Sequence, residues 1–228
     1  MFLILIAFMI IGFLVQSRLK SKFAKYSNIP LATGLSGREV ALRMLHDNGI
    51  HDVEVMSVPG KLTDHYDPTK KTVNLSPEVY NGRSVAAAAV AAHEVGHAIQ
   101  HATAYSWLEF RSKMVPAVSF SSRMMSFVFI FMFIGAGVIN MFPFTTVIWT
   151  IVILQGIITL FTLVTLPVEY DASDRALAYL STSGITGSLE HGQAKDALTW
   201  AANTYLVAAL ASLTQLAYWV MLLLANRD

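Results

Sequence analysis

Residues 84–104 read SVAAAAVAAHEVGHAIQHATA, and this stretch decides the fold and the chemistry of the chain. Its alanine-rich first half strongly favours helix, so we predict a helix through the whole stretch, with Ser84 as its N-cap. His93 and His97 are four residues apart and therefore lie on one helix face, one turn from each other. That spacing lets the two imidazoles bind one zinc ion, with Glu94 beside the metal to act on a water molecule. The alternative is a pair of ordinary helix-surface histidines near a glutamate.

A catalytic zinc site needs a third protein ligand and keeps its fourth position for water. We favour Glu169, in LPVEYDASDRAL at residues 166–177, because Pro167 is expected to begin a helix that carries Glu169 on its first turn. Glu109 is the rival, although it is expected to continue the helix of His97. His101 extends the histidine series, but eight residues of straight helix span about 12 Å, too far for one ion. We therefore expect His101 to be an interfacial group or a partner of a ligand.

The composition predicts a membrane protein. Apolar residues make up 54% of the 228 residues and charged ones only 14%, and the mean hydropathy is +0.52. Long apolar stretches indicate four spans, at residues 1–15, 124–142, 144–168 and 204–225. The first stretch has no basic residues before it and no small-residue cleavage site, so we expect an uncleaved anchor rather than a signal peptide.

The basic residues predict the orientation of these spans. Thirteen of the sixteen lie between Arg18 and Arg123, two lie between Arg175 and Lys195, and the last is Arg227. Since lysine and arginine concentrate on the cytoplasmic side, the soluble segments are expected in the cytoplasm and both termini outside. The net charge of +1 gives no argument for nucleic acid. Basic residues 18–25 are expected to contact lipid headgroups, and the absence of cysteine excludes disulfides and thiol catalysis.

The expected soluble part is small and of mixed structure. Residues 36–48 are typical of a helix that is capped by Ser36 and ended by Gly49. Alternating residues 50–58 and the segment 71–75 predict two strands, the second of which is a possible sheet edge for a peptide substrate or simply part of a hairpin. Ser76 and Pro77 begin a short helix before the zinc helix.

The chain resembles a known family in the segments DHYDPTKKTVNLSPEVY, VAAHEVGHAIQ and LPVEYDASDRAL, and in the order of its spans. It is similar to the bacterial YugP-type membrane zinc peptidases and, more distantly, to the membrane gluzincins HtpX and the CAAX prenyl proteases. In those gluzincins an aspartate four residues after the ligand glutamate supports a zinc histidine. Ser173 stands at that position here, between Asp171 and Asp174, so the identity of the supporting residue is open. Asp174 serves only if the helix is irregular there.

The resemblance implies a mainly α-helical, four-span membrane protein with a small α+β zincin-like cytoplasmic domain around the HExxH helix. We expect an anchor at residues 1–17, a cytoplasmic peptidase region at 18–123, a membrane hairpin at 124–168, a cytoplasmic segment at 169–203 and a last span at 204–228. The expected cofactor is one zinc ion on His93, His97 and Glu169. The expected location is the inner membrane of a bacterium, and the site is expected near the cytoplasmic membrane face.

The implied activity is peptide hydrolysis in membrane or misfolded proteins, with Glu94 as general base. The partners are then a protein substrate and the bilayer, and no nucleic acid. The alternative function is a non-catalytic zinc-binding membrane scaffold or sensor, although such a site has no need of Glu94 and prefers a closed fourth position. An oxyanion stabiliser is also required, and the candidates are His65, Tyr66, Tyr170 and His191.

Overall fold

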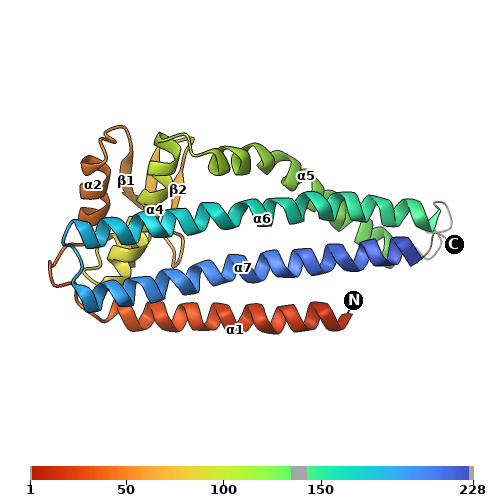
Figure 1. The fold of residues 1–228 in the computed structure, drawn as a ribbon, viewed down its shortest axis with the longest axis horizontal. Coiled ribbons are helices and arrows are strands. Elements are labelled where there is room, and N and C mark those ends of the chain that lie inside the picture. The colour runs from red at the N-terminus through yellow and green to blue at the C-terminus, as the bar shows by residue number, and fades with distance from the viewer. Residues whose placement is uncertain (1, 135–142, 226–228) are drawn as a thin grey trace. The chain divides into compact units, whose positions relative to one another are not determined.

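The computed structural model describes residues 2–134 and 143–225, and it is mainly helical with one small sheet (Figure 1). The end of the second expected span, residues 135–142, and Arg227 therefore lie outside the described residues. The helices are α1 (Phe2–Ser27), α2 (Gly37–Asp47), α3 (Pro77–Tyr80), α4 (Val85–Ala102), α5 (Ser106–Ile134), α6 (Phe144–Thr182) and α7 (Ser188–Ala225). The strands are β1 (Glu54–Ser57), β2 (His65–Asp67) and β3 (Thr72–Leu75).

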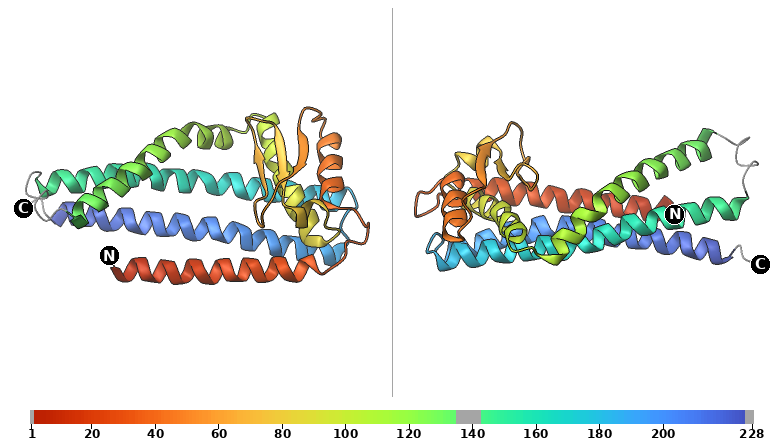
Figure 2. Two further views of the ribbon diagram at one scale, coloured as in Figure 1. Left: turned by 180° about the vertical axis from the view of Figure 1, so that it is seen from behind. Right: turned by 90° about the horizontal axis from the view of Figure 1, so that it is seen from above.

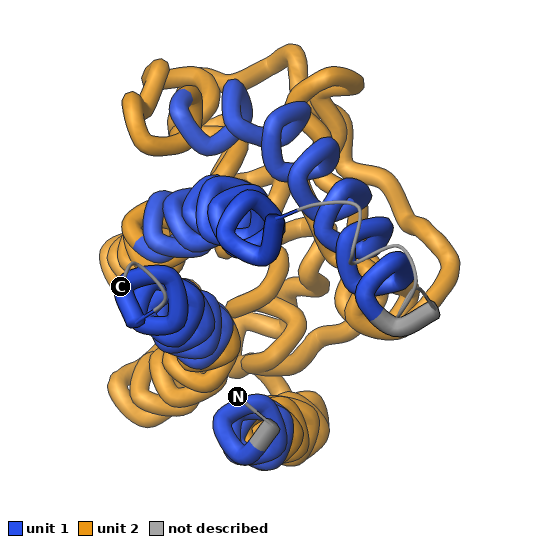
Figure 3. Tube along the Cα trace, turned by 90° about the vertical axis from the view of Figure 1, so that its right-hand side faces the viewer, with its two compact units in different colours: residues 1–12, 110–166, 205–228 blue, residues 13–109, 167–204 orange. Residues whose placement is uncertain are grey.

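The chain divides into two compact units, coloured separately in Figure 3. Unit 1 comprises residues 1–12, 110–166 and 205–228, and unit 2 comprises residues 13–109 and 167–204. Four helices are long and apolar enough to cross a membrane: Leu3–Ser27, Ser106–Met132, Phe144–Thr182 and Ser188–Ala225. The described parts of the four expected spans therefore each fall within a single helix.

Unit 1 is built from the first part of α1 and from the apolar parts of α5, α6 and α7. Its core contains Met125, Ile151, Leu154 and Trp219. The α6 and α7 segments run side by side in this unit (Figure 2), and the side chains of the buried Gln155 and Thr159 bond to Ser212. Large apolar side chains point outward from α5, among them Phe127 and Phe131, which are more than half exposed. Such a surface suits contact with lipid rather than water.

Unit 2 has α4 at its centre, where α4 packs against α2, β2 and β3. Alanines make this possible, because Ala88, Ala89, Ala91 and Ala92 are almost completely buried and let the neighbouring elements approach closely. The Ser84 hydroxyl accepts a hydrogen bond from the Ala87 N–H, which confirms Ser84 as the N-cap of α4.

The sheet in unit 2 has the order β1-β3-β2, with β1 parallel and β2 antiparallel to β3. Since β3 pairs on both sides, the sheet-edge alternative for residues 71–75 is excluded. The edges are β1 and β2. The sequence could not reveal this, because β2 has only three residues, HYD, too few to show the alternation that identifies a strand.

The helices before and after the sheet, α2 and α3, begin as their sequences predict. Ser36 and Glu39 form a reciprocal capping box at the start of α2. The helix ends at Asp47, and Gly49 adopts a φ of +70°, a conformation that glycine reaches without steric cost. Ser76 precedes α3, with Pro77 at its first position, as expected.

Two expected helix boundaries are wrong. Pro167 does not begin a helix but lies inside α6, which runs unbroken from Phe144 to Thr182. A proline inside a helix removes one backbone hydrogen bond and costs roughly 3 kcal/mol, and the burial of Val164 and Val168 on either side helps to offset this cost. Glu109 does not continue the helix of His97, because α4 ends at Ala102 and Glu109 belongs to α5.

Candidate metal centre

Three side chains from α4 and α6 converge in unit 2. Glu169 Oε2 lies 3.4 Å from His93 Nε2 and 3.6 Å from His97 Nε2. One ligand atom from each residue can be chosen so that all three lie within 4.8 Å of one another. Among the described residues, this is the group of histidine and acidic side chains that could hold a metal ion. The structure thus brings together the three expected ligands.

The donor atoms suit zinc. Zn²⁺ binds imidazole nitrogen and carboxylate oxygen at about 2.0–2.1 Å with tetrahedral angles, so two of its ligand atoms lie about 3.3 Å apart. The observed separations of 3.4 and 3.6 Å from Glu169 Oε2 are close to that value. Glu169 is only 3% exposed. A buried carboxylate has lost its hydration, and a bound cation compensates for that loss. Two histidines and one glutamate would leave the fourth coordination position of the ion open.

Ser173 contacts the first of the two histidines. Its Oγ lies 3.1 Å from His93 Nδ1, on the side of the ring away from Glu169. A regular helix places positions 169 and 173 on the same face, so the geometry of α6 resolves which residue supports His93. Asp174 does not take this role, because its side chain is exposed.

Gln100 contacts the second histidine, and the sequence reasoning missed it. The Gln100 side chain is fully buried, and its Oε1 lies 3.0 Å from His97 Nδ1. The amide nitrogen donates to the Val168 carbonyl and to Asp171 Oδ2, each at 2.8 Å. The available signal was the spacing, since a residue three positions after His97 shares its helix face.

Glu94 is buried next to the histidine pair, with 8% of its surface exposed. Burial raises the pKa of its carboxyl group, an effect that the nearby charges of His93 and His97 oppose and that Glu169 reinforces. Burial lowers the pKa of His97, but the hydrogen bond and charge of Glu169 outweigh it and the net shift is upward. The centre is therefore a largely buried site in which charges interact strongly.

The other candidates from the sequence lie in different environments. His101 is exposed and its Nδ1 lies 2.8 Å from the Tyr66 hydroxyl. Burial, aided by the charges of Asp52 and Asp67, raises the pKa of Tyr66 to about 12, so Tyr66 keeps its proton at neutral pH. The remaining candidates are His65, whose Nδ1 bonds the Thr63 carbonyl oxygen, Tyr170, which is exposed, and His191, whose Nδ1 is buried.

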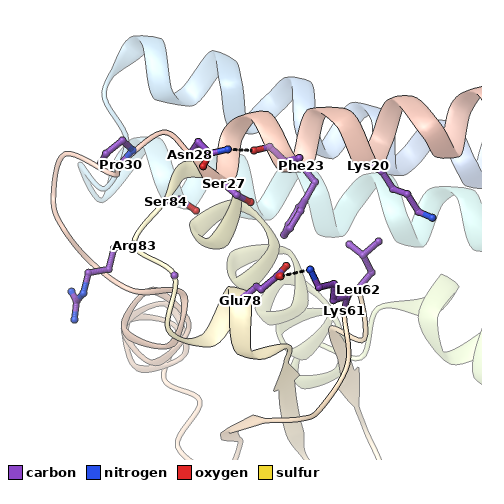
Figure 4. A pocket seen from close by; sticks show the side chains of 12 residues that line it. Lys20, Phe23, Ser27, Asn28, Pro30, Lys61, Leu62, Glu78, Arg83 and Ser84 are labelled. Carbon is purple, nitrogen blue, oxygen red and sulfur yellow. Dashed lines mark hydrogen bonds and ion pairs between the residues drawn. The ribbon is translucent and has the colours of Figure 1, made fainter.

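A separate pocket of about 830 Å³ lies in unit 2, between the end of α1 and the loop before β2 (Figure 4). Phe23 and Leu62 supply its apolar wall. Two of its three basic side chains are ion-paired, Lys61 with Glu78 and Arg83 with Glu39. None of the residues that converge at the metal centre lines this pocket.

Comparison with known proteins gives two matches that extend over both units. A family model described as "Putative neutral zinc metallopeptidase" matches residues 1–224. A protein of Bacillus subtilis (strain 168) named "Putative membrane protease YugP" is 42% identical over 219 residues, which are 96% of this chain and 94% of that protein. No solved structure matches the chain significantly. The matches thus concern the whole chain and not the histidine motif alone.

Proposed function

The chain belongs to the neutral zinc metallopeptidase family, and from that premise we propose that it is a membrane-bound zinc endopeptidase. Its substrates are membrane or misfolded proteins, which it cuts near the cytoplasmic face of the membrane. One observation carries the proposal: His93, His97 and Glu169 converge within 4.8 Å, and the buried carboxylate of Glu94 is adjacent in the sequence to the first of them.

The three converging side chains hold the metal in this proposal. A zinc ion in such a site lowers the pKa of water and polarises a carbonyl group. Two neutral imidazoles and one carboxylate leave a net positive charge on the centre, which attracts the developing negative charge of the substrate oxygen. Ser173 and Gln100 hold the imidazole rings from behind, so that both Nε2 atoms keep facing Glu169.

Glu94 is the general base. Its carboxylate takes the proton of the attacking water and passes it to the leaving amine. Burial raises its pKa, which makes the carboxylate a better proton acceptor than one in water. A purely structural zinc site requires no such group, and this difference favours the enzyme over the scaffold or sensor.

The substrate is expected to lie along β2. This strand is an edge of the sheet and packs against α4, the helix that carries both histidines. An extended peptide can add to such an edge through backbone hydrogen bonds. Two side chains of β2, His65 and Tyr66, then come close to the peptide, and the Tyr66 hydroxyl is protonated at neutral pH and can donate a hydrogen bond.

The site is proposed to lie at the cytoplasmic membrane surface of a bacterial inner membrane. Glu169 follows Leu166 by three residues in the unbroken helix α6, a rise of only about 4.5 Å. The apolar part of α6 ends near Leu166. A ligand so close to an apolar span favours membrane-tethered substrates, because a shared surface raises their effective concentration.

The test is hydrolysis of a generic unfolded protein by the full chain in detergent. We expect one zinc per chain, cleavage of the substrate, loss of cleavage with a chelator and recovery when zinc is restored. Cleavage that survives complete zinc removal would point to a contaminating protease. One tightly bound zinc without hydrolysis of unfolded or membrane substrates would favour the scaffold or sensor instead.

A further inference from the structure

We propose that Gln100 is a positioning residue for the metal centre, because its amide fixes the tautomer and orientation of the His97 ring. This inference deepens the proposed function and rests on the metal site proposed above. It assigns a role to a fully buried polar residue of α4, which bonds to His97 on the same helix and to Val168 and Asp171 on α6.

The neighbours of Gln100 determine which way its amide points. The Val168 carbonyl and the Asp171 carboxylate can only accept hydrogen bonds, and both lie 2.8 Å from the same side-chain atom. That atom must therefore be the NH₂ group, which has two protons to donate. The remaining atom, Oε1, is an acceptor, and it faces His97 Nδ1 at 3.0 Å.

The acceptor in turn fixes the imidazole of His97. Because an amide oxygen cannot donate, Nδ1 must carry the proton of this contact. Nε2 of the neutral ring is then the nitrogen with the free lone pair, and it lies 3.6 Å from Glu169 Oε2. A ligand imidazole needs this state, since a nitrogen binds metal only when unprotonated. Gln100 thus selects the tautomer that presents a lone pair to the metal position.

Asp171 and Arg175 hold Gln100 in place. Arg175 Nε donates to Asp171 Oδ2 at 2.6 Å, the same oxygen that receives the amide proton of Gln100. The guanidinium also lies over the Tyr105 ring, 5.9 Å from its centre. A continuous chain of contacts therefore runs from partly exposed side chains to the metal ligand.

Ser173 provides the comparison within the same site. Its hydroxyl can donate or accept, so the 3.1 Å contact with His93 Nδ1 supports that ring without selecting a tautomer. Gln100 offers only an oxygen to His97. The two histidines thus differ in how firmly their protonation is set, and loss of Gln100 is expected to weaken zinc binding more than loss of the Ser173 hydroxyl.

The experiment measures zinc affinity of the full chain in detergent by competition with a chelator. Gln100→Met keeps the volume but removes the acceptor, and we expect the zinc Kd to rise about 10–100-fold. Gln100→Glu keeps an oxygen for His97, and as a carboxylic acid it can still donate one proton to the Asp171 carboxylate, so its affinity should lie nearer to wild type. The matched control is Gln155→Met, which changes another buried glutamine, in unit 1, and should leave the affinity unchanged.

The relative zinc affinities of Gln100→Met and Gln100→Glu distinguish a positioning role from a packing role. If Gln100 only fills space, the apolar methionine is tolerated better than a carboxylate beside Asp171, and the order of affinities reverses. That reversal, or a Gln100→Met protein with wild-type affinity, would overturn the inference. A wild-type chain that binds no zinc would instead overturn the proposed function.

A direct readout examines the wild-type protein, and one variant serves only to assign the signal. In ¹⁵N-histidine spectra of the zinc-loaded wild-type protein, His97 should show a proton on Nδ1 that exchanges slowly because it is buried and bonded, with its signal identified by its absence from His97→Asn. Ligation through Nδ1 with the proton on Nε2 would contradict the inference.

Discussion

The carbonyl oxygen of Ala172 occupies the place that a side chain on Gly96 would need. A Cβ atom built on Gly96 would come within 2.6 Å of that oxygen, closer than any ordinary contact. Gly96 lies between Glu94 and His97 on α4, and Ala172 lies between Glu169 and Ser173 on α6. The absence of a side chain at position 96 thus lets the two helices approach closely enough for their ligands to meet.

Gly96→Ala should therefore destabilise unit 2 and weaken the metal centre. The added methyl group meets backbone, which cannot turn aside, so the helices must separate at a cost of about 1–3 kcal/mol. This cost exceeds the gain of about 1 kcal/mol in helix propensity. Thermal unfolding of the metal-free protein and zinc titration would measure the two effects.

The control for this change is Gly192→Ala. Gly192 lies in α7, and a Cβ atom there would meet nothing within 4 Å. This variant should keep its zinc affinity and unfold at the same or a higher temperature. If Gly96→Ala behaved in the same way, close approach of the helices would not be what brings the ligands together.

Glu169→Ala should lose most of its zinc, because the site retains only two imidazoles and a catalytic zinc site needs three protein ligands. Metal analysis of the purified chain is the measurement. Glu109→Ala is the informative control, since Glu109 is the rival ligand in the sequence and lies outside the converging group. Tight zinc in Glu169→Ala together with loss in Glu109→Ala would exchange the roles of the two residues.

Glu94→Gln should keep both the fold and the zinc while losing hydrolysis. The amide has nearly the same shape but cannot accept the proton of water, and loss of a general base costs about 10²–10⁴-fold in rate. Cleavage rates and zinc content of the same preparation would be compared. Glu78→Gln, which breaks only the exposed ion pair with Lys61, should cleave like wild type. Near-normal cleavage by Glu94→Gln would assign the base elsewhere.

Local signals predicted much of unit 2. Ser36 and Ser84 act as helix caps as their positions indicate, because a cap depends on residues only three positions apart. The metal group was also accessible, since His93 and His97 are related by helix spacing and Glu169 follows a recognisable span. Features that depend on neighbours within a turn or two of helix were thus within reach of the sequence.

Apart from Glu169, which was sought because the histidine pair needs a third ligand, features that depend on partners far along the chain were not within reach of the sequence. Pro167 reads as a helix start by local preference, but packing on both sides of it keeps α6 continuous. Gln100 and Asp171 are 71 positions apart in the sequence, and neither segment contains a pattern that predicts their contact. Strand β2 is too short to be identified without its partner β3. Tertiary contacts decide each of these cases.

The last prediction concerns topology and rests on the basic residues. The chain has no cysteine, so single cysteines can be introduced and labelled in intact cells without a background. Lys70→Cys and Lys195→Cys are exposed positions that the positive-inside rule places in the cytoplasm, where an impermeant reagent cannot reach them. Asn140→Cys and Asp228→Cys, at positions outside the described residues, should be labelled.

Permeabilised cells supply the control, because positions 70 and 195 should then react as fast as positions 140 and 228. The thirteen basic residues between Arg18 and Arg123 are the reason for expecting the first soluble stretch in the cytoplasm, since lysine and arginine are retained on that side of the membrane. Labelling at position 70 in intact cells would invert the arrangement. The metal centre in unit 2 would then face outward, and the substrates would have to be proteins outside the cytoplasm.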